Sequence, residues 1–245
     1  MSLYNTFNIT NPSAESTQSI YNSILRKSLS EFPEEVQLVI EPMTQATIKF
    51  YLDCKEKLPR TPSKFHYTFN LRDLSRIYEG LYLATIDKIA TKGQLVRLWR
   101  NECLRVIADR LIDNTDKSLV TDEMLPSLVK QFFKDVEEEV SANPILFGDY
   151  RLTDPEDPDS EDPRLYEDLG SFAEIREKME KILEDYNFNH LTMNLVLFSD
   201  CLDHINKCHR IIRFPKGSGL LVGFGGSGKQ SVTKIATYLA TYDLY

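Results

Sequence analysis

Nine residues near the C-terminal end, 223–231, carry the clearest chemical pattern in this chain. They read Gly-Phe-Gly-Gly-Ser-Gly-Lys-Gln-Ser, and their outer glycines and lysine follow the G-x-x-x-x-G-K spacing of a phosphate-binding loop. Glycines let several backbone N–H groups converge on one anion, and a helix that begins at the loop adds a favourable dipole. We therefore predict that the loop binds ATP or ADP, with Lys229 reaching the β- and γ-phosphates. The predicted contacts are Gly223, Phe224, Gly225, Gly226, Ser227, Gly228, Lys229, Gln230 and Ser231.

The residue after the lysine departs from this pattern. Such loops normally have Ser or Thr there, and its hydroxyl binds Mg²⁺. An amide oxygen of Gln230 can bind a hard cation, but its longer side chain places the oxygen elsewhere, and Ser231 follows one position late. Gln230 and Ser231 are the candidate Mg²⁺ ligands. We expect nucleotide binding and leave hydrolysis open.

The residues on either side of the loop predict the elements that position it. Residues 219–222 form a short apolar run, which is typical of a buried parallel strand. Apolar residues then recur at helical spacing from Val232 to Ala240. A strand, a glycine loop and a helix in this order disfavour the alternative of a glycine-rich turn that binds no nucleotide. An amphipathic helix over 194–213, with Phe198, Cys201 and Cys208 inward, precedes the strand.

Arg72 is the second candidate functional residue. Asn70 and Asp73 have the spacing of a helix cap with an acidic third residue, which places Arg72 in the first turn of a helix. A cation there opposes the helix dipole at a cost of about 0.3–1 kcal/mol. Either Arg72 senses a phosphate, or it forms an ion pair with Asp73 or another carboxylate. The residues leave both readings open.

The rest of the chain predicts a mainly α fold with a small α/β part. Helical periodicity without strand signals runs over about 12–140, which predicts a compact α-domain. Its first helix, after Asn11-Pro12, is expected to bury Ile20, Ile24 and Leu25. A second helix is expected from Pro33, with a kink at Pro42. In a later helix, from Gly93, the apolar face includes Trp99, and Arg97 and Arg100 are expected on the outer side. The acidic, proline-rich composition of 154–163 predicts a surface loop, and the residues at 172–186 are typical of a charged helix.

Composition narrows the classes of function. The 245 residues carry a formal charge of -8, which argues against a broad nucleic-acid surface because phosphate neutralisation needs clustered Lys and Arg. No apolar run approaches the roughly 20 residues of a membrane span. The four cysteines lack paired spacing, which favours reduced thiols inside the cell. Cys201, His204 and Cys208 lie along one predicted helix, but we expect the cysteines to be buried as small hydrophobes and no zinc site to form.

With these pieces in place, the sequence resembles dynein heavy chains of the axonemal kind over nearly its whole length. The Gly-Lys-Gln-Ser form at 228–231 looks like the fourth AAA module of their six-module ring, where Gln stands in the same place. The other stretches that carry the likeness are 61–67, 69–76, 98–102 and 144–149.

The resemblance implies a helical AAA+ lid domain followed by the truncated N-terminal part of a P-loop α/β AAA+ subdomain. Residues 1–140 would be the lid of the third module, and 141–193 a linker with an adenine-side loop and the acidic surface loop. Residues 194–245 would begin the large subdomain of the fourth module. By the same likeness, Arg72 matches the sensor arginine of the third module's lid. Ile145, Leu146 and Phe147 match the loop that wraps the adenine.

The implied function is ATP-driven movement along microtubules in the axoneme of a cilium or flagellum, a part of the cytoskeleton. The segment would serve as a regulatory nucleotide site, with ATP or ADP and Mg²⁺ as cofactors. We expect it not to hydrolyse ATP alone, because the third module's P-loop should precede residue 1 and the fourth module's Walker B carboxylates should follow Tyr245. Residues 242–245 would start a second strand.

The implied partners are neighbouring AAA+ modules of the same heavy chain and other dynein chains. Microtubules would be reached only through parts outside this segment, and neither nucleic acid nor a membrane is expected. The alternative is a stand-alone P-loop regulatory or binding module of helical type without motor activity. Another AAA+ remodelling ATPase would share the loop but has no reason to carry the lid motifs. Coding sequence that continues beyond Tyr245 to a strand ending in Asp-Glu would support the motor, and a stop codon would support the alternative.

Overall fold

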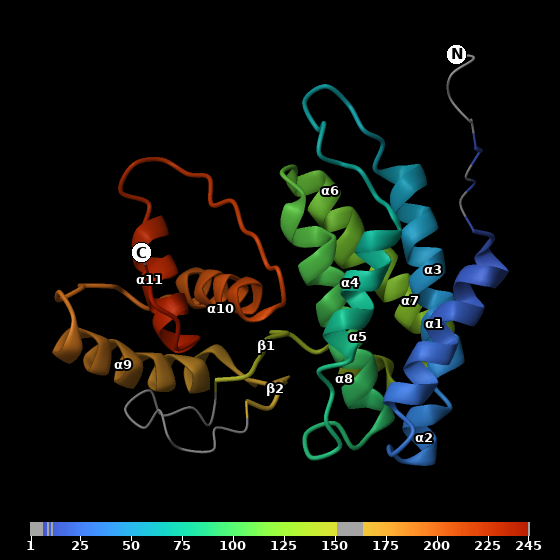
Figure 1. Cartoon of the computed structure of the whole chain (residues 1–245), viewed down its shortest axis with the longest axis horizontal. Helices are drawn as coiled ribbons and strands as arrows, with labels where there is room; N and C mark the ends of the chain where they lie inside the picture. The colour runs from blue at the N-terminus through green and yellow to red at the C-terminus, as the bar shows by residue number, and fades with distance from the viewer. Residues whose placement is uncertain (1–6, 9, 11, 151–163, 245) are drawn as a thin grey trace.

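Helices dominate the computed structural model, which describes residues 7–8, 10, 12–150 and 164–244. Figure 1 shows two groups of elements side by side: a bundle that contains α1 to α8, and a smaller group that contains α9 to α11, with β1 and β2 between them. The predicted mainly α fold is confirmed. The acidic loop predicted at 154–163 lies outside the described residues, as does Asn11, which precedes the first predicted helix.

The elements follow in chain order. The bundle consists of α1 (Ala14–Ser28), α2 (Glu34–Gln37), α3 (Ile40–Lys57), α4 (Leu71–Leu81), α5 (Lys92–Val106), η1 (Ala108–Arg110), α6 (Asn114–Ser118), the π-helix η2 (Leu119–Met124), α7 (Leu125–Phe132), η3 (Lys134–Val136) and α8 (Glu137–Ser141). The smaller group consists of β1 (Phe147–Gly148), β2 (Glu167–Asp168), α9 (Phe172–Asn189), α10 (Ser199–Arg213) and α11 (Lys229–Leu239). None of the helices in the described ranges is long and apolar enough to span a bilayer.

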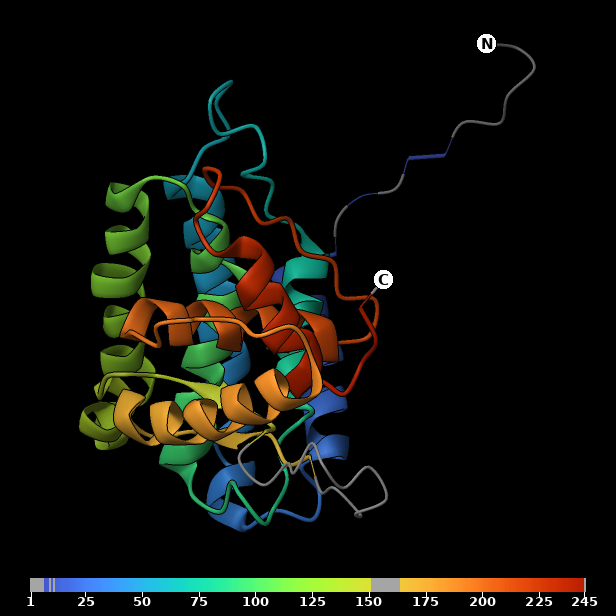
Figure 2. The same cartoon turned by 90° about the vertical axis from the view of Figure 1, so that its left-hand side faces the viewer.

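Two clusters of buried side chains hold these groups together. The bundle's core is centred on Trp99, which is fully buried, packs edge-on against Phe133 at 5.5 Å and donates its indole N–H to Thr47 Oγ1 at 2.8 Å. A buried indole needs such a partner, since an unpaired N–H would cost free energy. The second core joins α9, α10 and α11 through residues such as Met179 and Ile205. Figure 2 shows these three helices in front of the bundle.

The N-terminal helices differ from the sequence prediction in which faces they bury. Of the three residues predicted to face inward on α1, only Leu25 is buried, while Ile20 and Ile24 are 52% and 42% exposed. Tyr21 takes the inner face instead, because it stacks on Tyr78 at 4.2 Å and shares a hydrogen bond with Ser75 at 2.9 Å. An aromatic ring with a satisfied hydroxyl stabilises the contact more than an aliphatic side chain would.

The helix predicted from Pro33 is two helices in the structure. α2 ends at Gln37, α3 begins at Ile40, and the chain turns at Leu38 and Val39. The predicted kink at Pro42 is therefore wrong. Pro42 lies in the first turn of α3, where the missing N–H has no helical acceptor to lose.

The two arginines predicted on the outer side of α5 instead fix the chain that leaves the bundle. Arg97 donates to the carbonyl oxygens of Ala142 and Pro144, each at 2.6 Å, and pairs with Asp168 at 2.5 Å. Arg100 is 7% exposed and donates to Val140 O at 2.9 Å. Carbonyls at and after a helix end have no acceptor role within the helix and need other donors. Both guanidiniums supply them.

A buried carboxylate joins the bundle to the smaller group. Glu102 on α5 is fully buried, accepts hydrogen bonds from Asn101 Nδ2 and Tyr166 OH at 2.9 Å each, and pairs with Arg210 on α10. An added Cβ at Gly80 would lie 1.9 Å from Glu102 Oε2, so only glycine fits opposite the carboxylate. Two further ion pairs lie at the same junction: Lys88 pairs with Glu167 at 2.9 Å, and Arg105 pairs with Asp203 at 3.4 Å. We call these three ion pairs the ionic seam.

The sheet is smaller than predicted. β1 and β2 pair antiparallel, with Phe147 opposite Asp168 and Gly148 opposite Glu167. Residues 219–222 form no strand, and Leu220 and Val222 are 89% and 86% exposed. The start of a strand predicted at 242–245 is likewise not formed over 242–244. A parallel strand needs a neighbouring strand to satisfy its backbone, and no described residue pairs with either segment.

Candidate nucleotide-binding site

The glycine loop leads into α11 through two residues with left-handed backbone. Gly226 has φ 77° and Gly228, the N-cap of α11, has φ 80°. Glycine adopts these angles without the strain that a Cβ would add. No side chain caps α11, so the N–H groups of its first turn keep their hydrogen-bonding capacity. These donors and the helix dipole together favour an anion at the loop.

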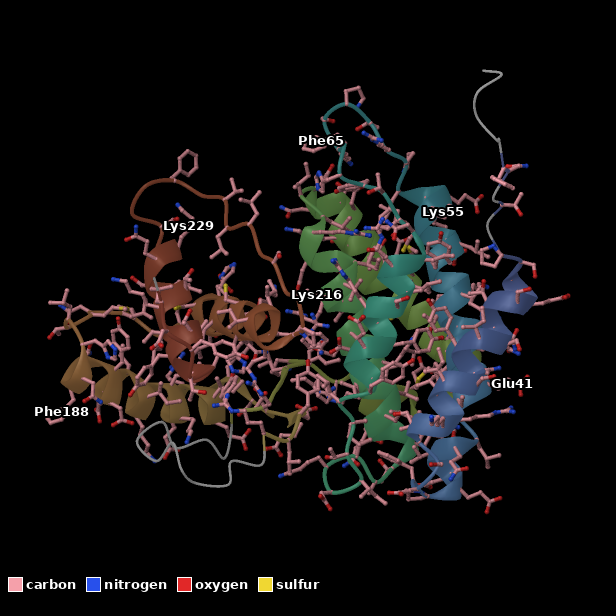
Figure 3. All side chains as sticks on the ribbon, in the orientation of Figure 1. Glu41, Lys55, Phe65, Phe188, Lys216 and Lys229 are labelled. Atoms are coloured by element: carbon pink, nitrogen blue, oxygen red, sulfur yellow. The ribbon has the colours of Figure 1, made fainter. Side chains whose placement is uncertain are left out.

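The loop is open toward solvent. A Cβ added at Gly225, Gly226 or Gly228 would meet no atom within 4 Å, and the side chain of Phe224 is 92% exposed. A ligand can therefore approach the loop backbone directly. Figure 3 shows Lys229 at the N-terminal start of α11, next to the loop.

The ammonium group of Lys229 lies inside the loop. Its Nζ donates to Gly223 O at 2.7 Å, to Phe224 O at 2.6 Å and to Ser227 Oγ at 3.1 Å. A positive charge is thus held among neutral carbonyl and hydroxyl oxygens, and none of its hydrogen-bond partners in the described part of the chain is a carboxylate. A phosphate oxygen in the loop would gain a charge-assisted hydrogen bond from this group. The predicted phosphate-binding residues are accordingly brought together, and they fit a nucleotide phosphate.

The candidate Mg²⁺ ligands occupy the first turn of α11. Gln230 is exposed and Ser231 is half-buried, and both side chains are neutral. No cluster of three or more His, Cys, Asp or Glu side chains able to hold a metal occurs in the described part of the chain. On α10, Cys201 and Cys208 are buried as predicted and His204 is exposed.

The predicted adenine-side residues are buried side chains. Ile145 and Phe147 pack in the bundle's core, whereas Leu146 packs in the second core, which also contains Ile235 and Leu239 of α11. The carbonyl oxygen of Leu146 accepts a hydrogen bond from Leu169 N at 2.8 Å. Of the three residues, only Leu146 thus shares a core with α11, and all three side chains are buried away from solvent.

Arg72 lies at the start of α4, in the other group of elements. The predicted cap is confirmed: Asn70 Oδ1 accepts from the Arg72 backbone N–H at 2.8 Å, and Asp73 Oδ2 accepts from Asn70 N–H at 2.9 Å. The Arg72 side chain is exposed and makes no hydrogen bond or ion pair within the described ranges. Asp73, the neighbouring carboxylate considered as its partner, pairs with Arg110 at 3.1 Å. Arg72 and Asp73 therefore do not form an ion pair in the structure.

A cavity of about 310 Å³ near the chain that leads to the loop contains residues that the sequence did not single out. It lies between α4, α10 and the residues around β1 and β2, and Arg164, His209 and Arg213 are among its lining. His209 is 1% exposed, and burial lowers its pKa to about 4 although Asp149, at 3.4 Å, acts in the opposite direction. Local sequence gave no signal for this cluster, because its members come from segments distant in the chain.

A helical lid followed by a glycine loop at a helix N-terminus defines the class as a segment of an AAA+ protein. Residues 44–143 match the AAA+ lid domain, and 193–245 match the P-loop containing dynein motor region D4. Over its whole length the chain is 46% identical to human dynein axonemal heavy chain 10 and 44% identical to the Chlamydomonas reinhardtii dynein-1-alpha heavy chain of the flagellar inner arm I1 complex. Mouse dynein axonemal heavy chain 2 is 34% identical, also over the whole chain.

Over its full length the chain matches a segment of axonemal dynein heavy chains, which confirms the resemblance carried by its motifs. It spans about 5% of the length of each of these three relatives.

Proposed function

We propose that this segment is a regulatory ATP- or ADP-binding part of an axonemal dynein motor. The matched relatives are axonemal dynein heavy chains, which places the chain in the axoneme of cilia or flagella, within the cytoskeleton. Movement along microtubules would then be an activity of the whole heavy chain. Neighbouring AAA+ modules and other dynein chains are the proposed partners, and microtubules would be reached through other parts of the heavy chain.

The observation that carries the proposal is the loop at the start of α11. Its uncapped N–H donors, its open glycine face and the Lys229 ammonium held inside it are the groups that bind phosphate in nucleotide-binding loops. In this proposal the loop backbone and Lys229 hold the phosphates, and Leu146 with its two neighbours supports the adenine side. Arg72 senses phosphate at the preceding module's site.

The segment by itself is proposed to hold nucleotide without turning it over. Phosphoryl transfer needs a metal-binding acidic group and a group that positions the attacking water. Gln230 and Ser231, the proposed Mg²⁺ contacts, are neutral, and the Walker B carboxylates are expected from another part of the heavy chain. The stand-alone alternative is less well supported, because the identity to heavy chains extends over the lid and the loop region alike.

Fluorescent-ADP binding tests the loop. Lys229→Ala should weaken the affinity of the chain for N-methylanthraniloyl-ADP by about tenfold or more, which corresponds to about 1.4 kcal/mol. Lys234→Ala, a lysine further along α11, is the matched control and should change affinity by less than about twofold. ATP turnover should be the same in the unchanged chain and in Lys229→Ala. Equal ADP affinity in all three proteins would overturn the proposal, as would turnover that disappears in Lys229→Ala.

A further inference from the structure

The end of the bundle that carries Arg72 pairs its carboxylates with other cations. Asp116 pairs with Lys64 at 2.5 Å and accepts a hydrogen bond from Tyr67 OH at 2.9 Å. Asp113 pairs with the same lysine at 3.2 Å. None of these carboxylates pairs with Arg72.

Asp73 is the carboxylate closest to Arg72 in sequence, and Arg110 engages it. The carboxylate is 4% exposed, and its two oxygens have separate partners, Asn70 N–H on one and Arg110 Nη1 on the other. A buried carboxylate without a cation is strongly unfavourable, so Asp73 needs one. Arg72, on a long flexible side chain one residue away, is the nearest alternative along the chain.

Arg110 also holds the segment that leads into α4. Its guanidinium lies over the ring of Phe69 at 4.7 Å, and its carbonyl oxygen is 3.1 Å from His66 Nε2. Arg110 therefore contacts His66, Phe69 and Asp73, which lie on both sides of Arg72 in the sequence. Two of its donors, Nε and Nη2, are buried and have no hydrogen-bond partner among the residues that the structure describes, so the side chain is held by this pairing and stacking.

We propose that Arg110 is a positioning residue for Arg72. By pairing with Asp73 and stacking on Phe69, it fixes the first turn of α4 and leaves the guanidinium of Arg72 available to a phosphate. Arg110 itself does not touch the nucleotide. The inference rests on the proposed phosphate-sensing role of Arg72 and adds the group that keeps Arg72 free.

A double-mutant cycle tests the inference in a full-length heavy chain that contains this segment. Lysines of the other nucleotide-binding loops, Lys229 included, are replaced by alanine so that only the preceding module binds N-methylanthraniloyl-ATP. Arg72→Ala should weaken this binding by about tenfold, and Arg110→Gln by about three- to tenfold. The double variant should be no weaker than Arg72→Ala within about twofold, because residues that act through one group are not additive.

Two further variants separate positioning from general damage. Arg110→Lys keeps a cation beside Asp73 and should bind within about threefold of the unchanged protein. Asp73→Asn added to Arg110→Gln removes the carboxylate that would recruit Arg72 and keeps an oxygen for the Asn70 N–H. It should restore most of the affinity lost in Arg110→Gln.

The outcomes distinguish the two ideas. If Arg72→Ala leaves the affinity unchanged, Arg72 does not sense phosphate and both ideas fail. If Arg72→Ala weakens binding but the losses simply add, or if Asp73→Asn restores nothing, the role of Arg72 stands and the inference about Arg110 is overturned.

Discussion

Replacing Glu102 should destabilise the junction between the bundle and the smaller group. The side chain is 0% exposed and satisfies donors from Asn101, Tyr166 and Arg210. Glu102→Ala removes the counter-charge of Arg210, whose side chain is only 12% exposed, and leaves the Tyr166 hydroxyl without this acceptor. Breaking one partner of a buried ion pair costs about 3–5 kcal/mol. At about 2–4 °C per kcal/mol for a chain of this size, the melting temperature should fall by about 6–20 °C.

Thermal unfolding of the 245-residue chain followed by circular dichroism measures this change, and urea titration gives the free energy of unfolding. Glu56→Gln, an exposed glutamate on α3, is the matched control and should stay within about 0.5 kcal/mol. Replacing both Glu102 and Arg210 by methionine should recover much of the loss, because the cost comes mainly from the uncompensated charge. A Glu102→Ala chain within about 1 kcal/mol of the unchanged protein would refute the reasoning.

Two further predictions concern pH and magnesium. Burial lowers the pKa of His209 from 6.5 to about 4, so the stability that neutral His209 contributes is fully present above pH 6.5. As pH falls toward 4, the unfolded chain takes up a proton that the folded chain does not, and the free energy of unfolding should drop by about 3 kcal/mol. His209→Gln should remove this slope in urea titrations, whereas His204→Gln on the exposed face of α10 should keep it; equal slopes in both variants would contradict the assignment. Removing magnesium should lower ADP affinity by less than about tenfold in the unchanged loop and by more in Gln230→Thr, because a hydroxyl at position 230 is placed for direct coordination whereas the longer Gln side chain puts its oxygen elsewhere. A hundredfold loss in the unchanged loop would show that Gln230 or Ser231 binds the ion well.

Signals within a few residues were sufficient for the loop and for several helix ends. The glycines and Lys229 form the loop because positive φ and an uncapped helix N-terminus depend on local sequence. The cap of α4 formed as predicted for the same reason, since Asn70 and Asp73 satisfy backbone groups of one turn. Stretches such as 61–67 and 98–102 were also sufficient to indicate the family, because family membership is a property of the sequence itself.

Tertiary structure decided which side chains meet. Tyr21 displaced Ile20 and Ile24 from the inner face of α1 because Tyr78, far along the chain, offers it a stacking partner. Periodicity predicts that a helix has an apolar face, but the neighbouring surface selects the residues that occupy it.

The sequence did not predict the charged contacts that join the bundle to the smaller group. Glu102 and Arg210 lie 108 positions apart, and Arg97 bonds to backbone and side-chain groups between 42 and 71 positions away. Charged residues are ordinarily solvated, so a pattern read from sequence places them on the surface. Here Glu102 is buried and Arg97 and Arg210 are half-buried, because folding brings groups of opposite charge and backbone carbonyls to them. The apolar run at 219–222 shows the converse case: its composition suits a strand, but a strand forms only where another strand lies beside it to pair with its backbone.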